Sequence, residues 1–182
     1  RENLLRVTGR RGVNASLLAG WLLSIGQKQA AKEVLEVLDC QEALPMLWRA
    51  SLSDDANKRQ QLIAEAERCH PQKVRFPNTL DEVRMLQTLS DSAFARYLLG
   101  CFWYSKRRYE EAVSCWRETL EKSPDYAPAH RLLGVYAWNK QQDAAQALAY
   151  LQRAVELEPE NARFLFELDF LKKSLGTPVN ER

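Results

Sequence analysis

The sequence predicts an all-α fold built from antiparallel helix pairs. Gly100 and Gly134 open two similar runs of small and bulky apolar residues, which repeat after 34 positions. Pro124 and Pro159 follow the second half of each run, and proline ends a helix because it lacks a backbone donor. No run of the chain shows the sustained alternation of apolar and polar residues that a strand requires. We therefore expect about ten helices and no sheet.

Each run describes two helices that cross closely at one small residue. Only a residue with little or no side chain lets two backbones approach, so glycine on the first helix faces alanine on the second. Large apolar residues then fill the space around the crossing to the density of a protein interior. The repeat positions are Leu99, Gly100, Trp103, Ala112, Trp116, Thr119 and Pro124 in the first pair, and Leu133, Gly134, Tyr136, Ala147, Leu151, Ala154 and Pro159 in the second.

The second pair contains one additional residue between its two small positions. Ala112 follows Gly100 by 12 positions, whereas Ala147 follows Gly134 by 13. A turn accepts an inserted residue at little cost in free energy. We therefore place the additional residue in a turn at residues 139–143.

Weaker versions of the pattern precede these two pairs. Residues 18–38 keep the same offsets, with Ala19 and Ala31 at the small positions and Gly26 in the turn between the helices. Residues 42–71 are interpreted as a further helix pair whose first helix is short. Residues 1–78 are therefore expected to form degenerate helical repeats.

Regular repeats are expected in the remainder of the chain. Thr79 followed by Glu82 predicts a capping box at the start of a leading helix. Leucines recur at helical spacing after Pro159 up to Gly176, which predicts a last helix that caps the stack. Residues 79–182 then contain the repeats 93–126 and 127–161, and the whole chain is expected to form one continuous solenoid.

Composition and charge exclude several classes of protein. Of the 182 residues, 46% are hydrophobic and 27% are charged, which suits a helical domain with a continuous core. No segment approaches the roughly 18 consecutive apolar residues of a membrane span, and the net charge is only +2. We expect neither a membrane nor a nucleic acid as partner. Because the chain begins at Arg1 without an initiator methionine, we also expect it to be a segment of a longer protein.

Residues that could carry catalysis are sparse, and we predict no catalytic residue, metal or cofactor. The two histidines, His70 and His130, stand in no metal-binding pair, phosphate loop or glycine-bounded serine motif. The acidic pairs Asp54–Asp55 and Glu110–Glu111 stand at expected helix starts, where negative charge suits the helix dipole. They are interpreted as caps, and this part of the protein is not expected to be an enzyme.

The cysteines show no spacing typical of zinc or redox sites. Two of them, Cys101 and Cys115, belong to facing helices of one predicted pair and could lie near each other. The other two are Cys40 and Cys69. We expect small buried thiols in a reducing compartment, and hence a cytoplasmic protein.

A concave binding surface follows from the predicted stacking. Helix pairs stacked at a constant small rotation expose the first helix of each pair on an inner wall. The side chains predicted there are unusually aromatic, and tyrosine, tryptophan and arginine are enriched at binding hot spots; the alternative is that the aromatic residues pack internally. The expected partner-binding residues are Tyr97, Cys101, Tyr104, Arg131, Val135, Trp138, Asn139, Phe166 and Phe170.

The repeat positions given above resemble the signature of tetratricopeptide repeats (TPR) over residues 93–159. This resemblance implies a right-handed superhelix of TPR-type antiparallel helix pairs, whose groove binds a protein or peptide. Some members of the family hold acidic C-terminal peptides through lysine and asparagine on the inner wall. This chain has Arg131 and Val135 at those places, and so departs from that clamp.

A narrower resemblance concerns the second pair and the last helix. The segments 137–140, 157–159, 166–169 and 175–176 are similar to the repeat region of large, poorly characterised bacterial proteins. Those proteins also carry a sugar-epimerase-like (galactose-mutarotase-like) β domain. The resemblance implies that this chain is their interaction segment.

Three functions remain open from the sequence. The favoured one is a non-catalytic interaction scaffold, whose groove binds a peptide, a protein or another domain of its own parent chain. The second is an RNA-binding helical repeat, which predicts salt-sensitive binding to single strands. The third is an accessory repeat segment of a larger carbohydrate-related enzyme.

Overall fold

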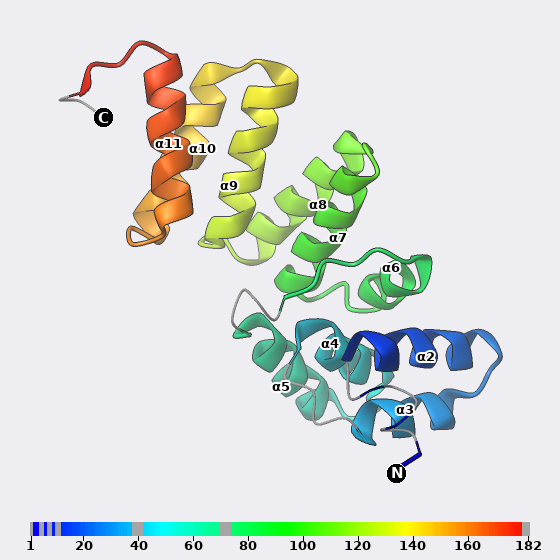
Figure 1. The fold of residues 1–182 in the computed structure, drawn as a ribbon. Helices are drawn as coiled ribbons and strands as arrows, with labels where there is room; N and C mark the ends of the chain where they lie inside the picture. Colours follow the sequence, from blue (N-terminus) through cyan, green and yellow to red (C-terminus); the bar gives the residue numbers. More distant parts are fainter. Residues whose placement is uncertain are drawn as a thin grey trace. The chain divides into compact units, whose positions relative to one another are not determined.

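The computed structural model describes residues 12–37, 42–69 and 74–179, together with positions 2, 3, 6 and 9. Over these residues the chain forms ten α-helices, one short π-helix and no strand (Figure 1). The all-α prediction is confirmed. The elements are α2 (Gly12–Ser24), α3 (Lys28–Val37), α4 (Ala43–Leu52), α5 (Ala56–Glu67), α6 (Leu80–Gln87), α7 (Ala93–Ser105), α8 (Tyr109–Lys122), α9 (Ala127–Tyr136), η2 (Ala137–Gln141), α10 (Ala144–Leu157) and α11 (Ala162–Ser174).

The chain divides into two compact units, residues 1–108 and 109–182. Helices α2 to α7 belong to the first unit, and helices α8 to α11 belong to the second. The sequence analysis instead separated degenerate repeats, residues 1–78, from regular repeats, residues 79–182. That division stays a prediction, and so does the continuous solenoid.

The first unit begins with the helix pair that residues 18–38 predicted. Ala19 on α2 and Ala31 on α3 are both fully buried, and the two helices pack against each other. Gly26 lies in the turn between them with φ +78°, a left-handed conformation that glycine adopts without steric cost. The predicted turn is therefore confirmed.

The next pair, α4 and α5, shows that only one member of the first acidic pair is a cap. The Asp55 carboxylate accepts hydrogen bonds from the backbone N–H of Asn57 at 2.8 Å and of Lys58 at 3.3 Å, at the start of α5. Asp54 instead forms ion pairs with Lys32 at 2.7 Å and Lys28 at 3.3 Å. Hydrogen bonds from these ammonium groups lower the pKa of Asp54. The sequence interpretation was right for Asp55 and wrong for Asp54, because two lysines on α3 compete for the latter.

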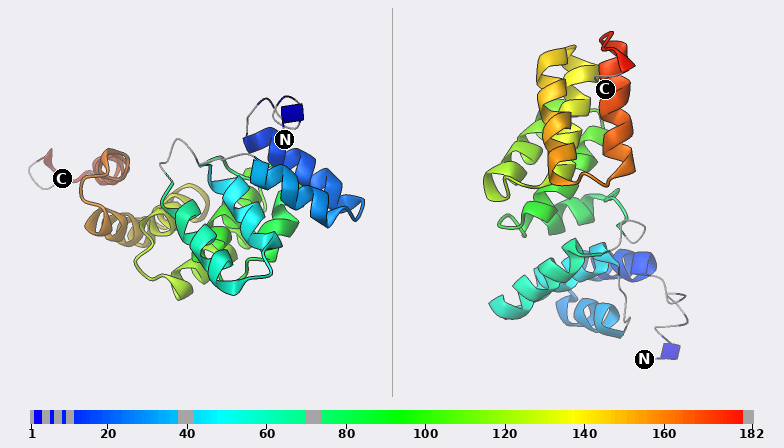
Figure 2. Two further views of the ribbon diagram at one scale, coloured as in Figure 1. Left: turned by 90° about the horizontal axis from the view of Figure 1, so that it is seen from below. Right: turned by 90° about the vertical axis from the view of Figure 1, so that its left-hand side faces the viewer.

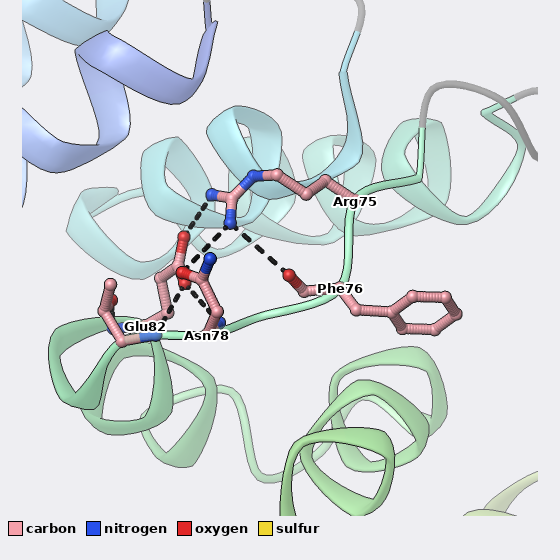
Figure 3. Close-up of polar contacts among 5 residues, drawn as sticks. Arg75, Phe76, Asn78 and Glu82 are labelled. Carbon is pink, nitrogen blue, oxygen red and sulfur yellow. Dashed lines mark hydrogen bonds and ion pairs between the residues drawn. The ribbon is translucent and has the colours of Figure 1, made fainter. Parts of the chain in front are cut away.

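A buried carboxylate anchors the segment that leads into α6. Glu82 is only 1% exposed and accepts hydrogen bonds from the backbone N–H of Asn78 at 2.8 Å and of Thr79 at 3.1 Å (Figure 3). Its other oxygen forms an ion pair with Arg75, and the Thr79 hydroxyl accepts from the Glu82 backbone N–H. The predicted capping box is therefore confirmed.

The environment of Glu82 favours its ionised form. Burial by itself raises the pKa of this carboxyl, but the hydrogen bonds from Arg75, Asn78 and Thr79 and the positive charge of Arg75 outweigh burial. They hold the pKa below its usual value. The ionised Glu82 carboxylate thus holds Arg75, Asn78 and Thr79 in place before α6 begins.

Helix α7 completes the first unit. Ser92 caps it by accepting a hydrogen bond from the Ala95 backbone N–H at 3.1 Å, and Gly100 is buried near its middle. Trp103, predicted to be interior, is only partly buried, and the Arg108 guanidinium lies 4.7 Å from its ring centroid. Ala112, the predicted counterpart of Gly100, is buried on α8 in the other unit, so the contact between these two residues stays a prediction.

In the second unit the close crossing at Gly134 is confirmed. A β-carbon built at this glycine would lie 2.9 Å from Leu151 Cγ and 3.2 Å from the Ala147 carbonyl oxygen. Real side chains do not approach so closely, so α9 and α10 can pack at this distance only because residue 134 is glycine. Pro124 and Pro159 follow the ends of α8 and α10, as expected.

The additional residue of the second pair does not form a simple turn. It widens the end of the first helix into the π-helix η2, which the Gln142 backbone N–H closes by donating to the Ala137 carbonyl. The Asp143 backbone N–H, just after η2, donates to the same carbonyl at 3.1 Å. Gln142 then takes φ +56°, and the Asp143 side chain caps α10. The predicted position was right and the predicted conformation was wrong, because a single inserted residue can be absorbed as one π-helical turn.

Helix α11 packs on the pair before it, so that α10 contacts both α9 and α11 (Figure 1 and Figure 2). Phe164 joins a buried cluster with Ala127 and Ala154. Leu168 and Leu171 join a second cluster, whose other members are Ala137, Ala147 and Leu151. Gly176 ends the helix with φ +81°, so the predicted last helix and its terminal glycine are confirmed.

Candidate binding groove

Six of the nine residues predicted to bind a partner line one pocket in the second unit. Helix α9 contributes two of them, η2 two and α11 two. The pocket has a volume of about 210 Å³. We call it the α9–α11 groove; its lining residues are Arg131, Val135, Trp138, Asn139, Leu151, Phe166, Glu167, Phe170 and Leu171.

Helix periodicity explains why these side chains converge. Arg131 and Val135 are four residues apart on α9, as are Phe166 and Phe170 on α11, so each pair occupies one helix face. Trp138 and Asn139 lie in the widened turn η2, which follows α9 directly. Leu151 and Leu171 form part of the buried cluster beneath the pocket.

An ion pair joins the two walls of the α9–α11 groove. Arg131 Nε donates to Glu167 Oε2 and Arg131 Nη2 donates to Glu167 Oε1, both at 2.6 Å. The side chains are 12% and 21% exposed. Arg163 Nε donates to the same Glu167 Oε1 at 3.1 Å. Two parallel N–H···O bonds fix both the distance and the orientation of a guanidinium and a carboxylate.

This arrangement favours the ionised form of Glu167. Partial burial raises its pKa, but the hydrogen bonds and charges of Arg131 and Arg163 outweigh burial and lower the pKa below its usual value. The sequence interpretation missed Glu167, because its partner is 36 residues away. The only sequence signal for this ion pair was the position of Glu167, about one repeat after Arg131.

The rim of the α9–α11 groove is apolar and open to solvent. Phe166 is 69% exposed and Phe170 is 54% exposed. Their rings stack on each other, with centroids 6.5 Å apart and planes inclined by 26°. Large apolar side chains gathered at an open pocket mark interaction surfaces more often than isolated exposed ones do.

The other three predicted binding residues lie on α7 in the first unit. Tyr97, Cys101 and Tyr104 follow one another at helical spacing on one face. Tyr97 is buried, whereas Cys101 and Tyr104 are partly buried. The role of these three residues in binding a partner stays a prediction.

Of the histidines and cysteines, His130, Cys69, Cys101 and Cys115 lie within the described part of the chain. His130 Nε2 lies 2.8 Å from the Pro124 carbonyl oxygen, and its ring is 6.0 Å from that of Tyr150, which is a packing role. Cys115 is buried, whereas Cys69 and Cys101 are partly buried. His70 and Cys40 lie outside the described residues. Where side chains are described, no group of three or more histidine, cysteine or acidic residues could hold a metal ion.

A search of the described helices for membrane spans finds none with the necessary length and apolar composition.

The chain is similar to known repeat proteins. The tetratricopeptide repeat family model matches residues 97–162 and 140–168. The chain is similar to the crystal structure of MamA, with 20% identity over 89% of this chain and 86% of that one (TM-score 0.45). It is also similar to MamA 41-end from Desulfovibrio magneticus RS-1, with 16% identity over 91% of this chain and 86% of that one (TM-score 0.47). A third similar structure is YrrB, described as a TPR protein with an unusual peptide-binding site. It has 16% identity over 91% of this chain and 96% of that one (TM-score 0.44).

The family model thereby confirms the tetratricopeptide resemblance over residues 97–168. The matches bear on the repeats alone. They give no support to the narrower resemblance, which placed the chain beside a sugar-epimerase-like domain.

Proposed function

We propose that the chain is a non-catalytic interaction scaffold, which holds a peptide or protein segment in the α9–α11 groove. The guest belongs to another protein or to another domain of the same parent chain. One observation carries the proposal: a stacked and exposed phenylalanine pair borders a pocket between α9, η2 and α11. Tetratricopeptide repeats are typically interaction scaffolds, and the repeat match includes α9, η2 and the first part of α11, up to residue 168.

The size of the pocket supports a side chain as its occupant. Pockets for small-molecule ligands usually measure roughly 300–1,000 Å³, whereas this one measures about 210 Å³. Such a volume suits one or two side chains of a longer guest. The exposed faces of Phe166 and Phe170 then provide apolar area on which the rest of the guest can lie.

The charged groups of the pocket are arranged for structure rather than for proton transfer. A general acid or base works best when its pKa is near the working pH, but the pKa of Glu167 is lowered by Arg131 and Arg163. Arg131, the cation of the pocket, is paired with Glu167. It is therefore poorly placed for the phosphate contacts on which RNA binding depends.

The proposal is tested by selecting peptides from a random dodecapeptide library displayed on phage, with the wild-type chain as bait. We expect the double variant Phe166→Ala/Phe170→Ala to weaken binding of the selected peptides by about 10- to 100-fold, as the loss of one or two hot spots does. Fluorescence anisotropy with labelled peptides measures the affinity.

The matched control is Leu165→Ala. Leu165 is also an exposed apolar residue of α11, but it does not line the pocket. We expect this variant to bind within about twofold of wild type. Equal weakening by both changes, or undiminished binding by the double variant, would show that the guest lies elsewhere.

A further inference from the structure

We infer that Glu167 determines which guests the α9–α11 groove accepts: it neutralises Arg131, so that the groove selects an uncharged segment with an apolar anchor side chain and rejects a carboxylate. This inference rests on the proposed function, and it adds the chemistry of the guest.

The first step concerns the donors of Arg131. The guanidinium offers Nε and Nη2 to the groove wall, and both already donate to Glu167 at 2.6 Å. A guest carboxylate would have to displace a carboxylate that is attached to the same chain and held in bidentate geometry. The resident group has the advantage, because its bond requires no further loss of translational freedom.

The second step concerns the cost of removing a guest carboxylate from water. Glu167 is ionised at neutral pH, since Arg131 and Arg163 lower its pKa, and its charge cancels that of Arg131. A guest carboxylate entering this partly desolvated pocket would lose its water without gaining an ion pair with Arg131 that offsets the loss. Arg163 offsets little of that cost, because its side chain is 70% exposed and screened by water.

The third step concerns what the groove offers instead. Val135, Trp138, Leu151 and Leu171 form apolar walls, and the stacked phenylalanines form the rim. A leucine or aromatic side chain gains free energy when it leaves water for such surfaces. Asn139 is exposed at the same pocket, and its amide can both donate to and accept from the backbone of a guest.

The experiment compares the wild-type chain with Glu167→Gln, using the same phage-displayed dodecapeptides. We expect wild type to enrich peptides with a leucine or aromatic anchor and few acidic residues next to it. One selected peptide is then synthesised in two forms, the original and an analogue in which the anchor is replaced by glutamate. Glu167→Gln should bind the acidic analogue at least tenfold more tightly than wild type does, and the original within about threefold.

A second variant separates the charge of Arg131 from the presence of Glu167. In Arg131→Gln/Glu167→Gln both charges are absent, so we expect the apolar preference to remain and the acidic analogue to gain nothing. Circular dichroism and thermal melting establish that each variant folds. If Glu167→Gln does not fold, the inference is tested by the ratio of the affinities of wild type for the original peptide and for the acidic analogue.

The outcomes distinguish the two proposals. If wild type binds the acidic analogue as tightly as the original, or if a folded Glu167→Gln shows an unchanged preference, the role of Glu167 is overturned while the groove remains a binding site. If wild type retains no peptide at all, the proposed function fails, and the inference fails with it.

Discussion

At the scale of single residues, Gly134 shows how one missing side chain determines a helix contact. The absence of a β-carbon allows Leu151 Cγ and the Ala147 carbonyl to approach positions that any other residue would occupy. The glycine costs up to about 1 kcal/mol in helix propensity relative to alanine. The gain in packing between α9 and α10 must exceed that cost.

We predict that Gly134→Leu lowers the free energy of unfolding by at least about 1–3 kcal/mol, the usual range for overpacking. The matched control is Gln141→Ala, because Gln141 is exposed in the neighbouring η2, and its change should remain within about 0.5 kcal/mol. Urea denaturation followed by circular dichroism measures both. Equal losses in the two variants would contradict the close crossing.

A second residue-scale prediction concerns Glu82 and pH. Its folded-state pKa is lower than the reference value of 4.5, so the ionised carboxylate stabilises the fold at every pH above about 4.5. This contribution is lost as the pH falls from 4.5 through the folded-state pKa. Acidification should therefore destabilise wild type more than Glu82→Gln, which has no carboxyl to protonate at this position.

Urea denaturation at about pH 7, 5 and 3.5 measures this difference. Glu82→Gln should be the less stable protein at pH 7, and the gap should narrow at pH 3.5. Glu167, whose pKa is also lowered, contributes in the same direction in both proteins and cancels from the comparison. A constant gap across the three pH values would show that the charge of Glu82 is not what orders residues 75–79.

At the scale of elements, the helix pairs were predictable because small residues and prolines recur at a fixed interval. Caps were predictable where one side chain serves its own helix, as with Thr79 and Asp55. The π-helix η2 was not predictable, because the interval between Gly134 and Ala147 gives the number of inserted residues but not their backbone conformation. Trp103 was misplaced for a related reason: an apolar pattern shows which face turns inward but not how deeply a ring is covered.

We predict that Asp143→Ala weakens α10 at its start and lowers the free energy of unfolding by about 1 kcal/mol, a typical cost for the loss of an N-cap. The Asp143 carboxylate accepts a hydrogen bond from the Gln146 backbone N–H at 2.9 Å. Gln152→Ala, an exposed change on the same helix, serves as control and should be neutral or slightly stabilising. Thermal melting compares the two; equal melting temperatures would contradict the capping role.

At the scale of the whole molecule, a repeat architecture predicts that each helix pair depends mainly on its neighbours. Stability in repeat proteins is approximately a sum of local terms. The sequence predicted six residues of the α9–α11 groove, because one repeat register places them on inner helix faces. It did not predict the Arg131–Glu167 pair, because the attraction between side chains 36 positions apart leaves no periodic signal.

The same locality gives a prediction for hydrogen exchange. Gly134→Leu should increase amide exchange in α9, α10 and α11, and should leave α2 to α5 close to wild type, because these helices belong to different compact units. Mass spectrometry of exchanged peptides resolves the two regions. Uniform loss of protection over the whole chain would show instead that the repeats unfold as one cooperative body.

The most direct test of the binding proposal is an NMR titration of the isotope-labelled chain with a peptide selected by the wild type. We predict that the largest shifts belong to the Trp138 indole N–H and to the backbone amides of Val135, Asn139, Phe166 and Phe170. Shifts confined to the first unit, residues 12–108, with these five signals unmoved, would contradict the assignment of the α9–α11 groove as the binding site.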